Sequence, residues 1–131
     1  AMRMTEEGAE PASVTDAMTM AAWRATDELG IESVICISGS GFTVRSMARF
    51  RPEANILGFS TNEATVQQLT LSWGTTPMLM SAGGSNEEMV GEALMLAKGA
   101  GLVRANELVG VLAGNDSRAP ATNVLRIERV P

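Results

Sequence analysis

The chain has 131 residues, 45% of them hydrophobic, with a net charge of −5 and a single cysteine, Cys36. This length predicts one domain with its own hydrophobic core, and the acidic balance argues against a nucleic-acid binder, which usually carries a basic face. Because the chain has no histidine, the usual zinc and haem sites and histidine-dependent nucleophilic triads are excluded. No apolar run is long enough to span a bilayer, and one cysteine fits a reducing compartment, so we expect a cytoplasmic protein.

The N-terminal part of the chain predicts an unstructured lead-in followed by a helix. Residues 1–12 show no apolar periodicity, and we interpret them as a flexible lead-in or a cloning remnant that precedes a domain spanning residues 13–131. From residue 13 to residue 29, apolar residues recur with helical spacing. Ser13 or Thr15 would cap this helix, and Gly30 follows its end. Its predicted apolar face consists of Val14, Met18, Ala21, Ala22, Ala25 and Leu29.

The rest of the chain predicts strands that alternate with helices. Apolar runs predict strands over residues 31–37, 55–60, 76–81 and 107–113. Helical spacing predicts helices over residues 43–50, 62–71 and 87–98. Pro52 stops the first of these, and the sequence Ser85-Asn86-Glu87-Glu88 has the capping-box pattern that opens the last. The final segment, residues 123–131, alternates apolar and charged residues and predicts an edge strand.

This order of elements predicts an α/β fold. Strands separated by single helices favour a three-layer αβα sandwich around a five-stranded, mostly parallel sheet. The last two strands are joined by about ten residues, which is too short for a helical crossover, so we expect them to pair antiparallel.

Several short motifs lie in a fixed order on these predicted elements. The first covers a loop and the helix after it, and the others follow along the chain, giving the positions Ser38, Ser40, Gly41, Thr43, Arg45, Arg49, Arg51, Pro52, Thr61, Leu71, Trp73, Gly74, Pro77, Thr122 and Asn123. In this register, over residues 13–131, the chain resembles the C-terminal domain of pyruvate kinase. The sheet of that domain has the strand order 3-2-1-4-5 with an antiparallel last strand, in agreement with the order of elements above.

The resemblance implies a regulatory, subunit-contacting domain. In this family a separate barrel domain carries the active site, so we expect no catalytic and no metal-binding residues here, no cofactor in this domain, and no phosphate transfer by this chain alone. Mg²⁺ and K⁺ would belong to the barrel. The expected partners are a phosphorylated small-molecule effector, the rest of a pyruvate kinase chain and further copies in a homo-oligomer, with no nucleic acid and no membrane.

The stretch from Ser38 to Thr43 is the candidate effector site. It joins a buried strand to a helix N-terminus, where free backbone amides and the helix dipole favour an anion. In the order 3-2-1-4-5 it lies at a topological switch point, beside the loop of residues 114–122 that carries Arg118. We therefore expect a phosphate to contact the amides of Ser40, Gly41 and Thr43 and the hydroxyls of Ser38 and Thr43. The candidate residues of the site are Ser38, Gly39, Ser40, Gly41, Thr43 and Arg118.

Two observations leave the role of this loop open. Relatives that bind fructose 1,6-bisphosphate have a lysine in this loop and further basic groups, whereas Gly39, Phe42 and Met89 occupy the corresponding positions here. The sequence therefore favours a monophosphate, such as a sugar phosphate or AMP, or a site that has lost its ligand. Alternatively, glycine and serine serve only the geometry of a strand-to-helix turn.

Several residues outside the loop also suggest roles. Arg45, Arg49 and Arg51 form the main cationic cluster, which would either contact a neighbouring domain or subunit or form internal ion pairs. We expect Trp23 and Trp73 to pack in the core or between subunits, and Cys36 to be inert because it lies in a buried strand.

The alternative to a pyruvate kinase domain is a stand-alone α/β protein, either a small-molecule binder or a flavin- or hydrolase-type enzyme. Asp116 and the glutamates offer no evident catalytic pair, and aromatic residues are few.

Overall fold

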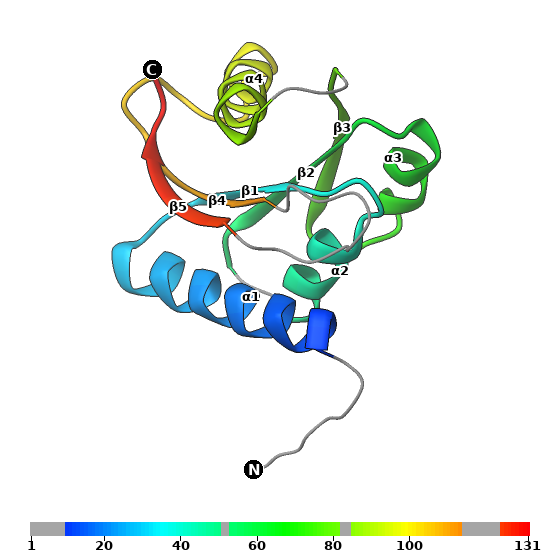
Figure 1. Cartoon of the computed structure of the whole chain (residues 1–131). Coiled ribbons are helices and arrows are strands. Elements are labelled where there is room, and N and C mark those ends of the chain that lie inside the picture. Colours follow the sequence, from blue (N-terminus) through cyan, green and yellow to red (C-terminus); the bar gives the residue numbers. More distant parts are fainter. Residues whose placement is uncertain (1–9, 51–52, 82–84, 114–123) are drawn as a thin grey trace.

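The fold is a layered α/β domain (Figure 1). The computed structural model describes residues 10–50, 53–81, 85–113 and 124–131. In chain order the elements are α1 (Glu10–Leu29), β1 (Ser33–Ile37), α2 (Phe42–Arg49), β2 (Asn55–Ser60), α3 (Glu63–Leu69), β3 (Thr75–Leu79), α4 (Asn86–Gly99), β4 (Leu108–Ala113) and β5 (Val124–Arg129). No helix in these ranges combines the length and the apolar character needed to cross a bilayer.

The predicted sheet is confirmed. Its strand order is β3-β2-β1-β4-β5, all pairs being parallel except β4 with β5. The central strand β1 places Ile35 beside Leu57 of β2 on one side and Val111 of β4 on the other. The antiparallel last pair follows from the short connection, which cannot return the chain to the opposite end of the sheet through a helix.

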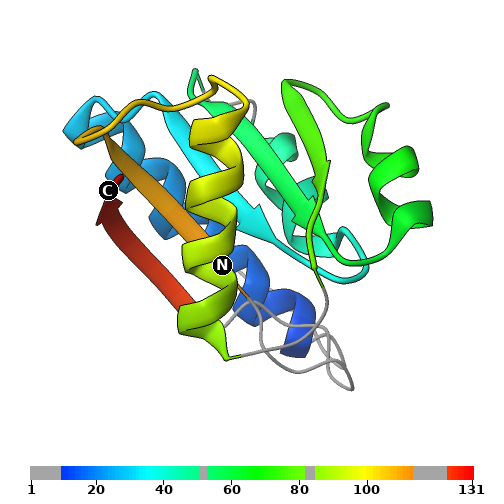
Figure 2. The ribbon, with the colours of Figure 1, turned by 90° about the horizontal axis from the view of Figure 1, so that it is seen from above.

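Alternate residues of the strands face two separate hydrophobic clusters. On one face, Ile35 and Ile37 pack in a cluster with α4. On the other, Val34 and Cys36 pack in a cluster with residues of α1, α2 and α3. Figures 1 and 2 show α4 alone on its face, with α1 and α2 across the sheet from it. The strands are therefore apolar on both faces, as expected for parallel strands covered by helices.

The predicted helix over residues 13–29 exists, but its start was predicted wrongly and its buried face only partly correctly: Ala22 is buried and Met18 packs against the core, as predicted. The helix begins at Glu10, so residues 10–12 belong to it and neither Ser13 nor Thr15 is a cap. Residues 1–9 lie outside the described part. The side chains of Val14 and Leu29, in contrast, are 47% and 55% exposed, and Thr15, Thr19 and Thr26 are buried beside Ala22.

Local hydrogen bonds explain why threonines can be buried on α1. The Thr19 hydroxyl donates to the carbonyl of Asp16 at 3.0 Å, and the Thr26 hydroxyl donates to the carbonyl of Trp23 at 2.8 Å. Once a hydroxyl is satisfied by its own helix, its burial costs little and the methyl group packs against the sheet side. Hydropathy alone does not register this compensation, so the sequence pattern missed the three threonines of the buried face.

Helix signals in the sequence are confirmed at several ends. Gly30 has a φ of 66°, and the amide of Ile31 donates to the carbonyl of Thr26 at 2.9 Å, which is the Schellman pattern of a helix C-terminus. Because of this bond, Ile31 belongs to the end of the helix, and β1 begins at Ser33 and not at residue 31 as predicted. The capping box of α4 is present between Ser85 and Glu88. The helix predicted over 62–71 is shorter, since Asn62 caps it and it ends at Leu69.

Candidate functional site

The glycine-rich loop lies at the carboxyl end of β1, as predicted. The strand order places β1 between β2 and β4, so the chain leaves β1 toward one side of the sheet and later reaches β4 on the other. Such a point in an open α/β sheet is where ligands usually bind. The second loop expected there, residues 114–122 with Arg118, lies outside the described residues, as does Asn123.

The hydroxyls of the loop cap the loop itself. The Ser38 hydroxyl oxygen accepts a hydrogen bond from the amide of Gly41 at 3.0 Å, and the Ser40 hydroxyl oxygen accepts one from the amide of Phe42 at 3.3 Å. Two donors at the N-terminus of α2 are thus already used inside the chain. The Gly41 amide, expected from the sequence to face a phosphate, is one of them.

Two other amides of the loop remain available. Gly39 and Ser40 are exposed, whereas Ser38, Gly41 and Thr43 are buried. The backbone N–H groups of Gly39 and Ser40 have no acceptor among the described residues. The five residues predicted from the sequence therefore do come together, but the exposed donors are the amides of Gly39 and Ser40.

A pair of hydroxyls fixes the direction in which the Ser40 amide points. The carbonyl of Gly39 accepts from the hydroxyl of Thr65 at 2.9 Å and from that of Ser60 at 3.2 Å. This carbonyl and the Ser40 amide belong to one trans peptide group, so they point in opposite directions. Because the carbonyl is held toward β2 and α3, the Ser40 N–H is turned away from them and toward the open side of the loop.

Arg45 brings a positive charge to the same loop. Its Nη1 donates to the carbonyl of Ser40 at 3.2 Å. The next arginine behaves differently, since Nη2 of Arg49 pairs with Oδ1 of Asp16 on α1 at 3.1 Å. The predicted cationic cluster is therefore divided between the loop and an internal ion pair, while Arg51 lies outside the described residues. A sequence signal for Arg45 existed, because side chains in the first turns of a helix lean toward its N-terminus.

Glycine is required at position 41 for two reasons. Its φ of 83° lies in the left-handed region that other residues rarely adopt. A Cβ there would lie 2.8 Å from Nη1 of Arg45, 3.1 Å from Cγ2 of Thr65 and 3.3 Å from Cδ2 of Leu69. The sequence suggested room for a ligand at both Gly39 and Gly41, but the space at Gly41 is taken by the protein itself.

The described residues contain no group of three acidic or cysteine side chains that could hold a metal ion. Burial raises the pKa of the Cys36 thiol from 9.0 to about 12, so the thiol stays protonated and unreactive at neutral pH. The two tryptophans are not in the core: Trp23 is 38% exposed and Trp73 is 45% exposed. Trp23 stacks on Phe50, with ring centroids 6.3 Å apart.

Comparison with known proteins identifies the family. The family model described as "Pyruvate kinase, alpha/beta domain" matches residues 16–128. This chain belongs to that family. Pyruvate kinase of Lactobacillus delbrueckii subsp. bulgaricus is 31% identical over 117 residues, covering 88% of this chain and 20% of the relative. Pyruvate kinase of Clostridium acetobutylicum is 27% identical over 125 residues, covering 95% of this chain and 26% of the relative.

A solved structure has the same fold as this pyruvate kinase domain. The crystal structure of a pyruvate kinase from Cryptosporidium parvum superposes with a TM-score of 0.77 at 21% sequence identity, covering 90% of this chain and 23% of that one. This chain thus spans about a quarter or less of the length of the pyruvate kinases it matches.

Proposed function

We propose that this chain is the part of a pyruvate kinase that binds a phosphorylated effector and contacts other subunits, without being catalytic itself. The observation that carries the proposal is the arrangement of the loop after β1. The amides of Gly39 and Ser40 have no acceptor among the described residues, and in the same turn the carbonyl of Ser40 accepts from the guanidinium of Arg45. Backbone amides with one cation suit a single phosphate group.

Simple energetics limit the affinity that this site would have for a monophosphate. Hydrogen bonds that involve a charged group contribute roughly 1.5–3 kcal/mol each. Three such bonds, from two amides and one guanidinium, give about 5–9 kcal/mol before binding costs, whereas a micromolar dissociation constant requires about 8 kcal/mol. Binding costs are at least about 4 kcal/mol, so these three bonds support an affinity in the submillimolar range at best. A second phosphate would need a further cationic site, for which Arg118 is the candidate.

Titration calorimetry with glucose 6-phosphate, AMP and fructose 1,6-bisphosphate tests the effector site. Arg45→Gln removes the cation beside the loop and is expected to weaken monophosphate binding about 10- to 100-fold. Arg49→Gln is the matched control, because it makes the same charge change four residues along α2 and breaks only an exposed ion pair with Asp16. It should change the affinity less than about threefold.

Two results would contradict this assignment. One is the absence of binding by all three compounds at millimolar concentration, which would indicate that the loop is only a strand-to-helix turn. The other is equal weakening by Arg45→Gln and Arg49→Gln, which would indicate a general charge effect.

The edge strand β5 supports the proposed subunit contact. Within the described part of the chain β5 pairs with β4 alone, and its Ile127 is 40% exposed. An edge strand with an exposed apolar side chain is suited to contact a second copy of the chain across a symmetric interface. In sedimentation equilibrium, we expect a dimer at high concentration that Ile127→Lys disrupts. Leu79→Lys on the opposite edge strand, where Leu79 is 46% exposed, is the control. A strict monomer at millimolar concentration would contradict the contact.

The remaining partner in the proposal is the rest of a pyruvate kinase chain. This chain matches 20–26% of the length of its curated relatives. Transfer of phosphate from phosphoenolpyruvate to ADP, with the Mg²⁺ and K⁺ expected for it, is assigned to the remainder.

A further inference from the structure

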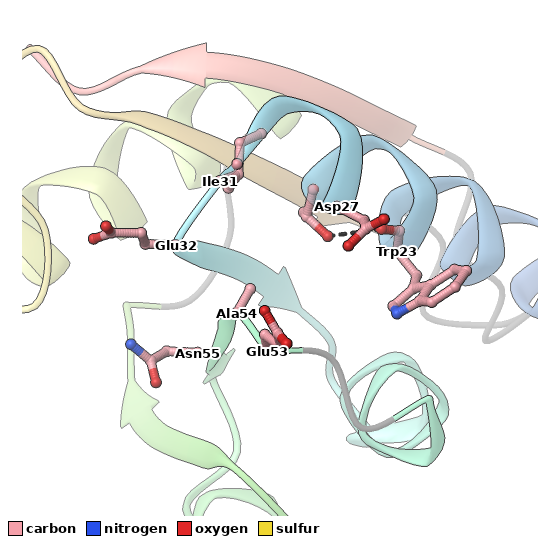
Figure 3. Close-up of a pocket in the computed structure, with 9 residues that line it drawn as sticks. Trp23, Asp27, Ile31, Glu32, Glu53, Ala54 and Asn55 are labelled. Atoms are coloured by element: carbon pink, nitrogen blue, oxygen red, sulfur yellow. Dashed lines mark hydrogen bonds between the residues drawn. The ribbon is translucent and has the colours of Figure 1, made fainter.

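A separate hollow opens at the other end of the sheet from the glycine loop. It has a volume of about 330 Å³ and lies where α1 ends and where β1 and β2 begin. Trp23 and Asp27 of α1 line one side, and Glu53 and Ala54 line the other (Figure 3). Because β1 and β2 are parallel, their first residues lie at the edge opposite to the loop. This hollow therefore has no part in the effector site proposed above.

The bottom and one wall of the hollow are apolar. Thr26, Ile31 and Ala54 are 4%, 6% and 8% exposed. The Thr26 hydroxyl is already used, since it donates to the carbonyl of Trp23. The Trp23 indole stacks on Phe50 with an angle of 19° between the ring planes, which holds it in place as a wall. An aliphatic group would find apolar contact here without displacing any internal hydrogen bond.

The opening of the hollow carries negative charges that no described residue neutralises. Figure 3 shows the carboxylates of Asp27 and Glu53 facing the gap beside the indole, while that of Glu32 points away from them. None of these three side chains has a hydrogen bond or an ion pair with a described residue, and no lining residue is basic. Elsewhere in the described chain, Asp16 and Glu87 are each paired with an arginine. The hollow is therefore a place where a positive charge would be favoured.

The geometry points to an organic cation rather than a metal ion. No three acidic groups in the described ranges converge closely enough for metal coordination. An ammonium or guanidinium group, in contrast, is attracted both by carboxylates and by the face of an indole. We propose that the hollow binds a small organic cation. Its charged head lies between Asp27 and Glu53 against Trp23, and its short aliphatic chain lies over Ile31 and Ala54.

Tryptophan fluorescence provides a direct test, because the chain has only two tryptophans. In the Trp73→Phe variant, Trp23 is the single reporter. The probes are n-butylamine and n-butylguanidine, with n-butanol as the neutral control of similar size. We expect both cations to change the Trp23 emission saturably at millimolar concentration, with binding weakened by added salt, and n-butanol to have no saturable effect.

Charge variants in the same background separate this pocket from general surface charge. Asp27→Asn and Glu53→Gln should each weaken binding of the cations about two- to fivefold, as expected for partly exposed ion pairs. Glu28→Gln is the matched control, since Glu28 neighbours Asp27 on α1 and is exposed but does not line the hollow. It should leave the affinity unchanged. Thermal unfolding of each variant would establish that its fold is retained.

The inference is overturned by any of three results. The first is no saturable change with either cation. The second is equal binding of n-butanol, which would make the hollow an apolar site. The third is a loss in Glu28→Gln as large as that in Asp27→Asn. If a lysine-rich peptide binds while neither small cation does, the occupant is a protein segment and the proposed ligand class is wrong.

Discussion

Replacing Gly41 by alanine tests whether glycine is required at this position because of the backbone conformation, because of steric crowding, or because of both. An alanine at a φ of 83° costs roughly 1–2 kcal/mol of folding free energy. Its Cβ would also lie 3.1 Å from Thr65 and 3.3 Å from Leu69, and such overpacking typically costs about 1–3 kcal/mol. The Arg45 contact at 2.8 Å is relieved by movement of a flexible side chain. We therefore expect Gly41→Ala to lower the free energy of unfolding by about 2–5 kcal/mol.

Two other glycines serve as matched controls. Gly30 has a φ of 66° but an added Cβ there has no neighbour within 4 Å, so Gly30→Ala reports the conformational cost alone, about 1–2 kcal/mol. Gly39 has neither a positive φ nor a close neighbour, so Gly39→Ala should be within about 0.5 kcal/mol of the parent. Because all three changes restrict the unfolded chain similarly, that effect cancels in the comparison.

Urea denaturation monitored by circular dichroism measures these differences. The expected order of destabilisation is Gly41→Ala, then Gly30→Ala, then Gly39→Ala. If Gly41→Ala is no more destabilising than Gly30→Ala, the crowding by Thr65 and Leu69 is not real and this account of the loop fails.

Three further outcomes follow from the structure. Ser46→Ala should leave stability unchanged or raise it by up to about 1 kcal/mol, because the buried Ser46 hydroxyl has no hydrogen-bond partner among the described residues; a loss above that amount in urea denaturation would reveal one. Cys36 should resist thiol reagents in the native state. Since its pKa is raised to about 12, its stabilising contribution is complete below pH 9.0 and falls as the pH rises toward 12, a slope that Cys36→Val should lack. Finally, a coupled assay with phosphoenolpyruvate, ADP, Mg²⁺ and K⁺ should give background only, and turnover by this chain alone would refute its assignment as non-catalytic.

The sequence by itself determined the order of elements and the class of the sheet. Periodicity distinguishes the helices from the short apolar strands, and the connection lengths decide which strands are parallel. Local sequence signals also predicted helix ends correctly, such as the capping box at Ser85 and Gly30 at the end of α1. The loop from Ser38 to Thr43 was found for the same reason, because its glycines, its serines and the following helix are adjacent in the chain.

Only the tertiary structure decided which groups of that loop are free and which are used. Ser38 and Ser40 bind amides of their own turn, and Thr65, far along the chain, holds the Gly39 carbonyl. It also separated Arg45, which contacts the loop, from Arg49, which pairs with α1. The buried face of α1 and the hollow between Trp23 and Glu53 likewise join distant parts of the chain. Such features depend on which side chains meet across elements and which polar groups are already satisfied, and neither is encoded in local periodicity.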